Sequence, residues 1–289
     1  MSTPAQHADA QGRLRLDIAR RVADAHRGIA DPPLFALVSG STVEQLADER
    51  SDIDMCIVFA ALPDEAVLRA ACARVGDEWF WHQGGLSEGS LVVSFHVDGI
   101  EVQIGYANEQ GLTADLDDLL IAHNPDTPNH KLAEGLLKAV PLLGHDRLAV
   151  LQARLAAFPP ELGQAMVKHG LATPTPWRAA AQLVHRDAAL WCREIQVDAC
   201  YRLLLVLCGL NGRYFTRFQV KRVHRLAAKL THAPPALAER IEALLGAPVP
   251  EAFAALHRLE GEVLELVAQQ LPEIELDTLR RRREAYPAA

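Results

Sequence analysis

Two aspartates separated by one residue, Asp52 and Asp54, are the side chains with the clearest chemical potential in this sequence. They open the run DIDMCIVF (residues 52–59), whose β-rich composition predicts a strand. Side chains alternate faces along a strand, so both carboxylates point to the same side, ~7 Å apart. Two negative charges so placed repel each other. A divalent cation such as Mg²⁺, which prefers hard oxygen ligands, would compensate them.

A glycine–serine pair, Gly40-Ser41, precedes these acids, and ten residues separate Ser41 from Asp52. The pair closes a turn between an apolar strand predicted over residues 34–38 and a short helix predicted over 42–47. Backbone N–H groups and a hydroxyl in such a turn can hold a phosphate. The sequence therefore predicts a phosphate-binding turn beside the two carboxylates.

A third carboxylate, Glu101, belongs to a predicted β-hairpin. The β-rich runs 91–97 and 100–106 flank Asp98-Gly99, a pair typical of tight hairpin turns because both turn positions need positive φ. Three carboxylates beside a phosphate-binding turn indicate phosphoryl or nucleotidyl transfer. In such a site Glu101 would be the third metal ligand, the general base, or both. An exposed strand glutamate paired with a base across the hairpin is the ordinary alternative.

The elements that must position these residues occupy the first half of the chain, and the second half differs in pattern and charge. Residues 1–140 mix helical and β-rich stretches and contain 22 acidic and 10 basic residues. Residues 141–289 are almost wholly helical in period, with 15 acidic and 19 basic residues. We therefore predict an α/β (α+β) domain with a mixed sheet over residues 1–145, followed by an all-α helical domain over 146–289.

The spacing of Gly40, Ser41, Asp52 and Asp54 resembles the signature of the nucleotidyltransferase superfamily, which includes polymerase β and the aminoglycoside nucleotidyltransferases. In that signature an apolar residue and Gly-Ser are followed, ten residues later, by Asp-apolar-Asp-apolar. The run IEVQI resembles the later strand on which aminoglycoside adenylyltransferases place a catalytic glutamate, and Glu101 is the matching position. The resemblance implies Mg²⁺ bound by both aspartates and a triphosphate, most simply that of ATP, contacted by the Gly-Ser turn.

The helical half has a second, less specific resemblance. The stretch LCGLNGRYFTRFQVKRVHRLAAKL (residues 207–230) is similar to a Leu-Asn-x-x-Tyr-Phe…Lys stretch in bacterial proteins that join this catalytic domain to a helical C-terminal domain. This resemblance implies that Lys221 contacts the triphosphate and that Tyr214 lies near the nucleotide. The ordinary alternatives are a lysine on the polar face of an amphipathic helix and a tyrosine in the core.

Composition limits the classes of function. The 289 residues are 49% hydrophobic and 23% charged, as in ordinary globular proteins, and the net charge of −8 makes nucleic acid an improbable partner. No apolar run approaches the ~20 residues that span a membrane. The five cysteines contain no C-x-x-C pair, which favours free thiols and a cytoplasmic location.

Together these observations predict a Mg²⁺-dependent nucleotidyltransferase. It would transfer a nucleoside monophosphate, AMP from ATP, to a hydroxyl of a small molecule such as an aminoglycoside-like antibiotic. Its partners would be a nucleoside triphosphate and a hydroxyl-bearing acceptor. Adenylylation of a protein, neutralisation of a toxin and non-catalytic nucleotide binding are the alternatives, and the sequence leaves the oligomeric state open.

Overall fold

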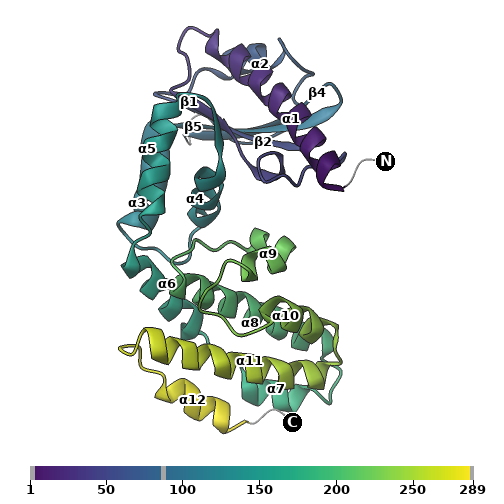
Figure 1. Ribbon diagram of the computed structural model, residues 1–289, viewed down its shortest axis with the longest axis vertical. Coiled ribbons are helices and arrows are strands. Elements are labelled where there is room, and N and C mark those ends of the chain that lie inside the picture. Colours follow the sequence, from purple (N-terminus) through teal and green to yellow (C-terminus); the bar gives the residue numbers. More distant parts are fainter. Residues whose placement is uncertain (1–3, 86–88, 287–289) are drawn as a thin grey trace. The chain divides into compact units, whose positions relative to one another are not determined.

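The computed structural model describes residues 4–85 and 89–286. Internal contacts divide the chain into two compact units (Figure 1). The first comprises the described residues of Met1–Asp118 together with Leu132–Ala157, and the second comprises Leu119–Lys131 and the described residues of Phe158–Ala289. The boundary predicted from the sequence follows residue 145, whereas the contacts keep residues 146–157 with the first unit.

A six-stranded sheet forms the first unit, in the order β3-β4-β5-β2-β1-β6. Its strands are β1 (Phe35–Val38), β2 (Ile53–Phe59), β3 (Trp81–Gly85), β4 (Ser90–Val97), β5 (Ile100–Asn108) and β6 (Val140–Leu143). Strands β2 and β5 run parallel, and every other neighbouring pair is antiparallel. The sheet is therefore mixed, as the sequence predicts.

Helices α1 (Pro4–Arg27) and α2 (Glu65–Cys72) cover one face of this sheet (Figure 1). Buried apolar residues of both helices, such as Val22 and Leu68, form one core with Ile53 and Met55 of β2 and Ile104 of β5. Because side chains alternate along a strand, the polar residues between them project from the opposite face.

The remaining helices of this part of the chain lie between the strands or, for the last of them, after β6. They are η1 (Gly40–Thr42), a 3₁₀ turn, and the α-helices α3 (Glu109–Leu120), α4 (Asn129–Lys138) and α5 (His145–Ala156). Helices α3 and α4 contribute residues to both units, and α5 packs against β1 and β6. The packing of α5 on the sheet is the reason that it belongs to the first unit.

The β4–β5 hairpin confirms the turn predicted from Asp98-Gly99. Asp98 has a φ of 53° and Gly99 a φ of 77°, so both turn residues occupy the left-handed region. The short helix predicted over residues 42–47 is wrong, because the chain forms only the 3₁₀ turn η1 and then a loop into β2. The edge strand β3, whose first four residues are all exposed, was not predicted from the sequence.

The second unit is helical, which confirms the predicted class of this half. Its elements are α6 (Pro160–Ala172), α7 (Trp177–Leu183), α8 (Ala189–Leu210), the 3₁₀ helix η3 (Arg217–Arg222), α9 (Val223–Ala227), α10 (Leu237–Gly246), α11 (Val249–Gln270) and α12 (Asp277–Glu284). Helices α6 and α8 approach closely at Gly163 and Gly209, where a Cβ on either residue would press on the other's carbonyl oxygen. Across the described residues, none of the helices has both the length and the apolar character needed to cross a membrane.

Candidate active site

The Gly40-Ser41 turn lies directly against the carboxylate of Asp54. The backbone N–H of Ser39 donates a hydrogen bond to the Asp54 carbonyl oxygen over 2.9 Å, which joins the end of β1 to β2. Gly40 follows with a φ of 67°, and a Cβ added there would overlap Asp54 Oδ2 and lie 3.2 Å from Asp54 Cγ. Only glycine meets both conditions, because it tolerates positive φ and has no Cβ.

Strand β2 determines how the two aspartates are presented. Ile53 and Met55 are buried in the core under α1 and α2, whereas Asp54 is half-buried on the opposite face. Asp52 immediately precedes the strand and is exposed. The alternation that buries the two apolar residues therefore leaves Asp54 beside the glycine–serine turn, on the face of the sheet that α1 and α2 do not cover.

The position of Glu101 follows from the strand register. In the parallel β2–β5 pair, Asp54 lies opposite Gln103, so the immediate sheet neighbour of Asp54 is an amide rather than Glu101. On the other side of β5, Glu101 lies opposite His96 of β4. Continuing the parallel register by one residue places Glu101 beside Asp52. Glu101 is half-buried there, next to the first aspartate in the sheet.

The three carboxylates do not form a closed metal cage. Among residues 4–85 and 89–286, no group of three His, Cys, Asp or Glu side chains is arranged to hold a metal ion. Mg²⁺ in nucleotide enzymes, however, is usually held by one or two carboxylates together with water and substrate phosphates. Asp54 against the Gly40 turn, with Asp52 two residues before it, suits that second arrangement, and Glu101, next to Asp52 in the register, stays a predicted third ligand.

Arg15 of α1 lies beside the candidate site and was not predicted from the sequence. It is only 1% exposed, and its Nε donates a hydrogen bond to the carbonyl of Ser51 over 2.9 Å. Its Nη1 donates to Gln11 Oε1 over 2.6 Å. Burial lowers the pKa of the guanidinium, and the charges of Asp48 and Asp52 partly offset this effect. Arg15 thus fixes the residue that immediately precedes Asp52.

The sequence does contain an indication that Arg15 is buried. Arg15 stands three and four residues before Ile18 and Ala19, so it shares the buried apolar stripe of α1 with them. A charged residue on such a stripe needs polar partners from another element. The sequence alone does not name those partners, because Ser51 lies 36 residues away along the chain.

The two residues expected from the helical half have different surroundings. Tyr214 is 3% exposed, and its ring packs edge-on against Phe158 with 5.1 Å between centroids. Lys221 is exposed on η3. The surroundings of Tyr214 are those of a core residue, so only Lys221 is accessible to a ligand.

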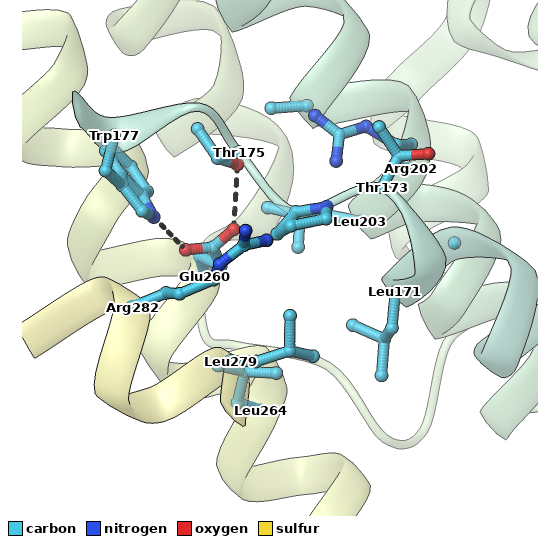
Figure 2. Close-up of a pocket in the computed structure, with 13 residues that line it drawn as sticks. Leu171, Thr173, Thr175, Trp177, Arg202, Leu203, Glu260, Leu264, Leu279 and Arg282 are labelled. Carbon is cyan, nitrogen blue, oxygen red and sulfur yellow. Dashed lines mark hydrogen bonds between the residues drawn. The ribbon is translucent and has the colours of Figure 1, made fainter. Parts of the chain in front are cut away.

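A pocket in the second unit contains none of the predicted site residues (Figure 2). At its wall the carboxylate of Glu260 accepts hydrogen bonds from Thr175 Oγ1 over 2.8 Å and from Trp177 Nε1 over 2.9 Å. Burial raises the pKa of Glu260, and these two donors partly oppose the shift. The bonds tie the start of α7 to α11, so Glu260 has a structural role here.

Comparisons with known proteins add little to this geometry. No protein-family model matches the sequence, and no curated protein matches it. The chain is similar to a solved structure described as a nucleotidyltransferase-like protein from Exiguobacterium sibiricum 255-15, with 14% identity and a TM-score of 0.44, over 93% of this chain and 80% of that one. A similarity at this level identifies no family.

Proposed function

We propose that this protein is a Mg²⁺-dependent nucleotidyltransferase that transfers AMP from ATP to a hydroxyl of a small molecule, such as an aminoglycoside-like antibiotic. The observation that carries the proposal is the approach of Gly40 to Asp54. Because the position of a Cβ at Gly40 is taken by the Asp54 carboxylate, the backbone N–H groups of the turn lie close to that carboxylate, where a metal ion bound by it could hold a phosphate.

Gly40 and Ser41 would hold the β- and γ-phosphates, through backbone N–H groups and the serine hydroxyl. Asp52 and Asp54 would hold Mg²⁺, which when bound would orient the triphosphate and offset negative charge developing at the α-phosphate. Arg15 would keep Asp52 in place by fixing the carbonyl of Ser51. Apart from Arg15 of α1, these roles use residues at the junction of β1, η1 and β2.

Glu101 would act on the acceptor. Its register beside Asp52 supports a role as general base that takes the proton of the acceptor hydroxyl. The hydroxyl oxygen would then form a bond to the α-phosphorus as the bond to the bridging oxygen of the β-phosphate breaks. Pyrophosphate leaves with that electron pair, and the acceptor leaves as its AMP ester.

The direct test uses ATP labelled at the α-phosphate, with Mg²⁺ and a panel of aminoglycosides and other polyhydroxylated small molecules. The wild type should transfer label to a small molecule, and Asp54→Asn should lose the transfer. Asp77→Asn is the matched control, because Asp77 is exposed and lies outside the site. Label on a protein band in a cell extract would favour adenylylation of a protein instead. ATP binding without transfer to any acceptor would favour the non-catalytic alternative.

A further inference from the structure

Four residues, one from each of four neighbouring strands, form a row across the sheet of the first unit. Asp54 of β2 lies opposite Gln103 of β5, and on the other side of β5 Gln103 lies opposite Ser94 of β4. Ser94 in turn lies opposite Trp81 of β3. Residues opposite each other in a sheet project from the same face, so Trp81 shares a face with Asp54. We call these four residues the Trp81 row.

The row ends in an exposed aromatic ring. Trp81 is 41% exposed, and β3 is the last strand in the sheet order. Ser94, by contrast, is 1% exposed, and its hydroxyl accepts a hydrogen bond from Gln103 Nε2 over 3.5 Å. Beside the row, the exposed ring of Phe80 stacks on His96 with 4.8 Å between ring centroids. The edge of this face is therefore aromatic, and ordered polar groups lead from it towards the candidate active site.

The strands of this face supply carboxylates and neither lysine nor arginine. Strands β2, β3, β4 and β5 contain no residue of these two types. Between Arg74 and Lys131, a stretch that includes three of these strands, the chain has ten acidic residues and no lysine or arginine. The electrostatic potential of such a surface favours a cationic ligand. An ammonium group over the Trp81 ring would also gain cation–π attraction, which is strongest for tryptophan.

The row also limits the length of such a ligand. Neighbouring strands lie about 4.8 Å apart, so the backbone of Trp81, three strands from Asp54, is about 14 Å from it. Glu101, the proposed general base, lies two strands from Trp81 and two residues along the strand direction, which corresponds to about 12 Å. A single sugar ring cannot cover this distance, whereas several linked rings can.

We infer that Trp81 binds one end of a cationic acceptor made of several linked rings, with an aminated ring over the indole and a hydroxyl of another ring at Glu101. The rings between them would lie along Ser94 and Gln103. The inference rests on the proposed function for the reaction at Glu101. To that function it adds Trp81 as an acceptor-binding residue, in a site built entirely from the first unit.

The test is a calorimetric titration of the full chain, without ATP or divalent metal, with three probes. Kanamycin has several aminated rings, glucosamine has a single aminated ring, and maltotriose has several neutral rings. The wild type should bind kanamycin more tightly than either of the others. Trp81→Ala should weaken kanamycin binding by about two- to thirtyfold, the range of a cation–π contact. Trp81→Phe should weaken it less, because it keeps an aromatic face.

Trp191→Ala is the matched control, because Trp191 is 43% exposed and lies on α8 of the second unit. It should bind kanamycin as the wild type does, and thermal melts should show that every variant is folded. Equal kanamycin affinity in the wild type and Trp81→Ala would overturn the inference. So would a wild type that binds glucosamine or maltotriose as tightly as kanamycin, or one that binds none of the three probes.

Failure of this inference can be told apart from failure of the proposed function. In the label-transfer assay, Trp81→Ala should raise the KM for the acceptor and leave kcat nearly unchanged, because Trp81 is remote from the reacting hydroxyl. If label is transferred and that KM is the same in Trp81→Ala and the wild type, the function stands and Trp81 is not an acceptor residue. If kanamycin binding depends on Trp81 but the wild type transfers no label, the face binds aminated saccharides and the transferase proposal fails.

Discussion

At the scale of single residues, the site depends on Gly40 more than on any charged group. A carboxylate can be brought against a phosphate-binding turn only if the turn has no side chain in the way. Gly40 meets this condition because it adopts a positive φ and because the position that a Cβ would occupy lies against Asp54. The spacing of glycine, serine and aspartates in the sequence therefore has a direct steric meaning.

Replacing Gly40 with alanine should damage both stability and nucleotide binding. Positive φ costs about 1–2 kcal/mol for a residue with a Cβ, and displacing Asp54 adds to this. We expect a lower free energy of unfolding in urea and at least tenfold weaker Mg²⁺-dependent ATP binding. Gly135→Ala is the control, because a Cβ at that position in α4 would meet nothing within 4 Å. Normal ATP binding by Gly40→Ala would contradict the steric account.

Another residue-scale feature is a buried polar network in the first unit. His26 Nδ1 donates to the carbonyl of Val22 over 2.8 Å, because a carbonyl can only accept. Nε2 must then accept the hydroxyl proton of Tyr106, over 2.7 Å, and that oxygen lies 3.3 Å from the sulfur of Cys72. Burial lowers the pKa of His26, so the neutral imidazole is favoured in the folded state.

The network predicts a dependence of stability on pH. Below its ordinary pKa of about 6.5, the imidazole binds a proton more readily in the unfolded chain than in the folded one. The free energy of unfolding should therefore fall as the pH drops below about 6.5, by at most ~1.4 kcal/mol per pH unit from this group. Urea titrations at several pH values should show a smaller fall for His26→Gln, and the wild-type fall for His82→Gln, whose histidine is exposed. Equal slopes in the wild type and His26→Gln would exclude this role.

At the scale of elements, helix α1 both covers the sheet and holds the loop that enters β2. Its apolar stripe packs on the sheet, and Arg15 on that stripe binds the Ser51 carbonyl. The helix and the first aspartate are thereby coupled without being close in sequence. The loop from η1 to β2 contains no helix of its own, so this contact contributes to its order.

Removing the Arg15 guanidinium should be costly. Arg15→Met would leave the Ser51 carbonyl without this donor, and we expect a loss of about 1–3 kcal/mol in the free energy of unfolding. Arg20→Met in the same helix should cost well under 1 kcal/mol, because the ion pair of Arg20 with Asp17 is exposed. Chemical denaturation of both variants provides the comparison. An equal cost for the two would show that Arg15 is no more than a surface cation.

The sequence predicts those strands and turns whose own residues show the pattern typical of the element. Strands β1, β2, β4 and β5 have apolar or alternating runs, and Asp98-Gly99 specifies its turn by backbone conformation alone. Strand β3 has no such pattern, since its first four residues are exposed and it exists through pairing with β4. The register that places Gln103 rather than Glu101 opposite Asp54 is likewise a property of the assembled sheet.

At the scale of the whole molecule, the sequence predicts two parts and their classes because composition and periodicity change along the chain. The sequence could not assign residues 119–131 to the second unit, because that assignment depends on their contacts with residues distant in sequence. The same holds for the contact between Lys131 of this segment and the ring of Phe218 on η3. The candidate site residues could be predicted from the sequence because they belong to local motifs. The residues that contact them in the folded protein could not.

The central claim is that Asp52 and Asp54, beside the Gly40 turn, hold a divalent metal with a triphosphate. The most direct measurement is binding of Mn²⁺, as a spectroscopic substitute for Mg²⁺, by electron paramagnetic resonance with and without ATP. It needs no knowledge of the acceptor. We expect the wild type to bind Mn²⁺ with ATP more tightly than ATP alone does, and Asp54→Asn to lose at least tenfold in affinity. Equal Mn²⁺ binding by the wild type and Asp54→Asn would contradict the account.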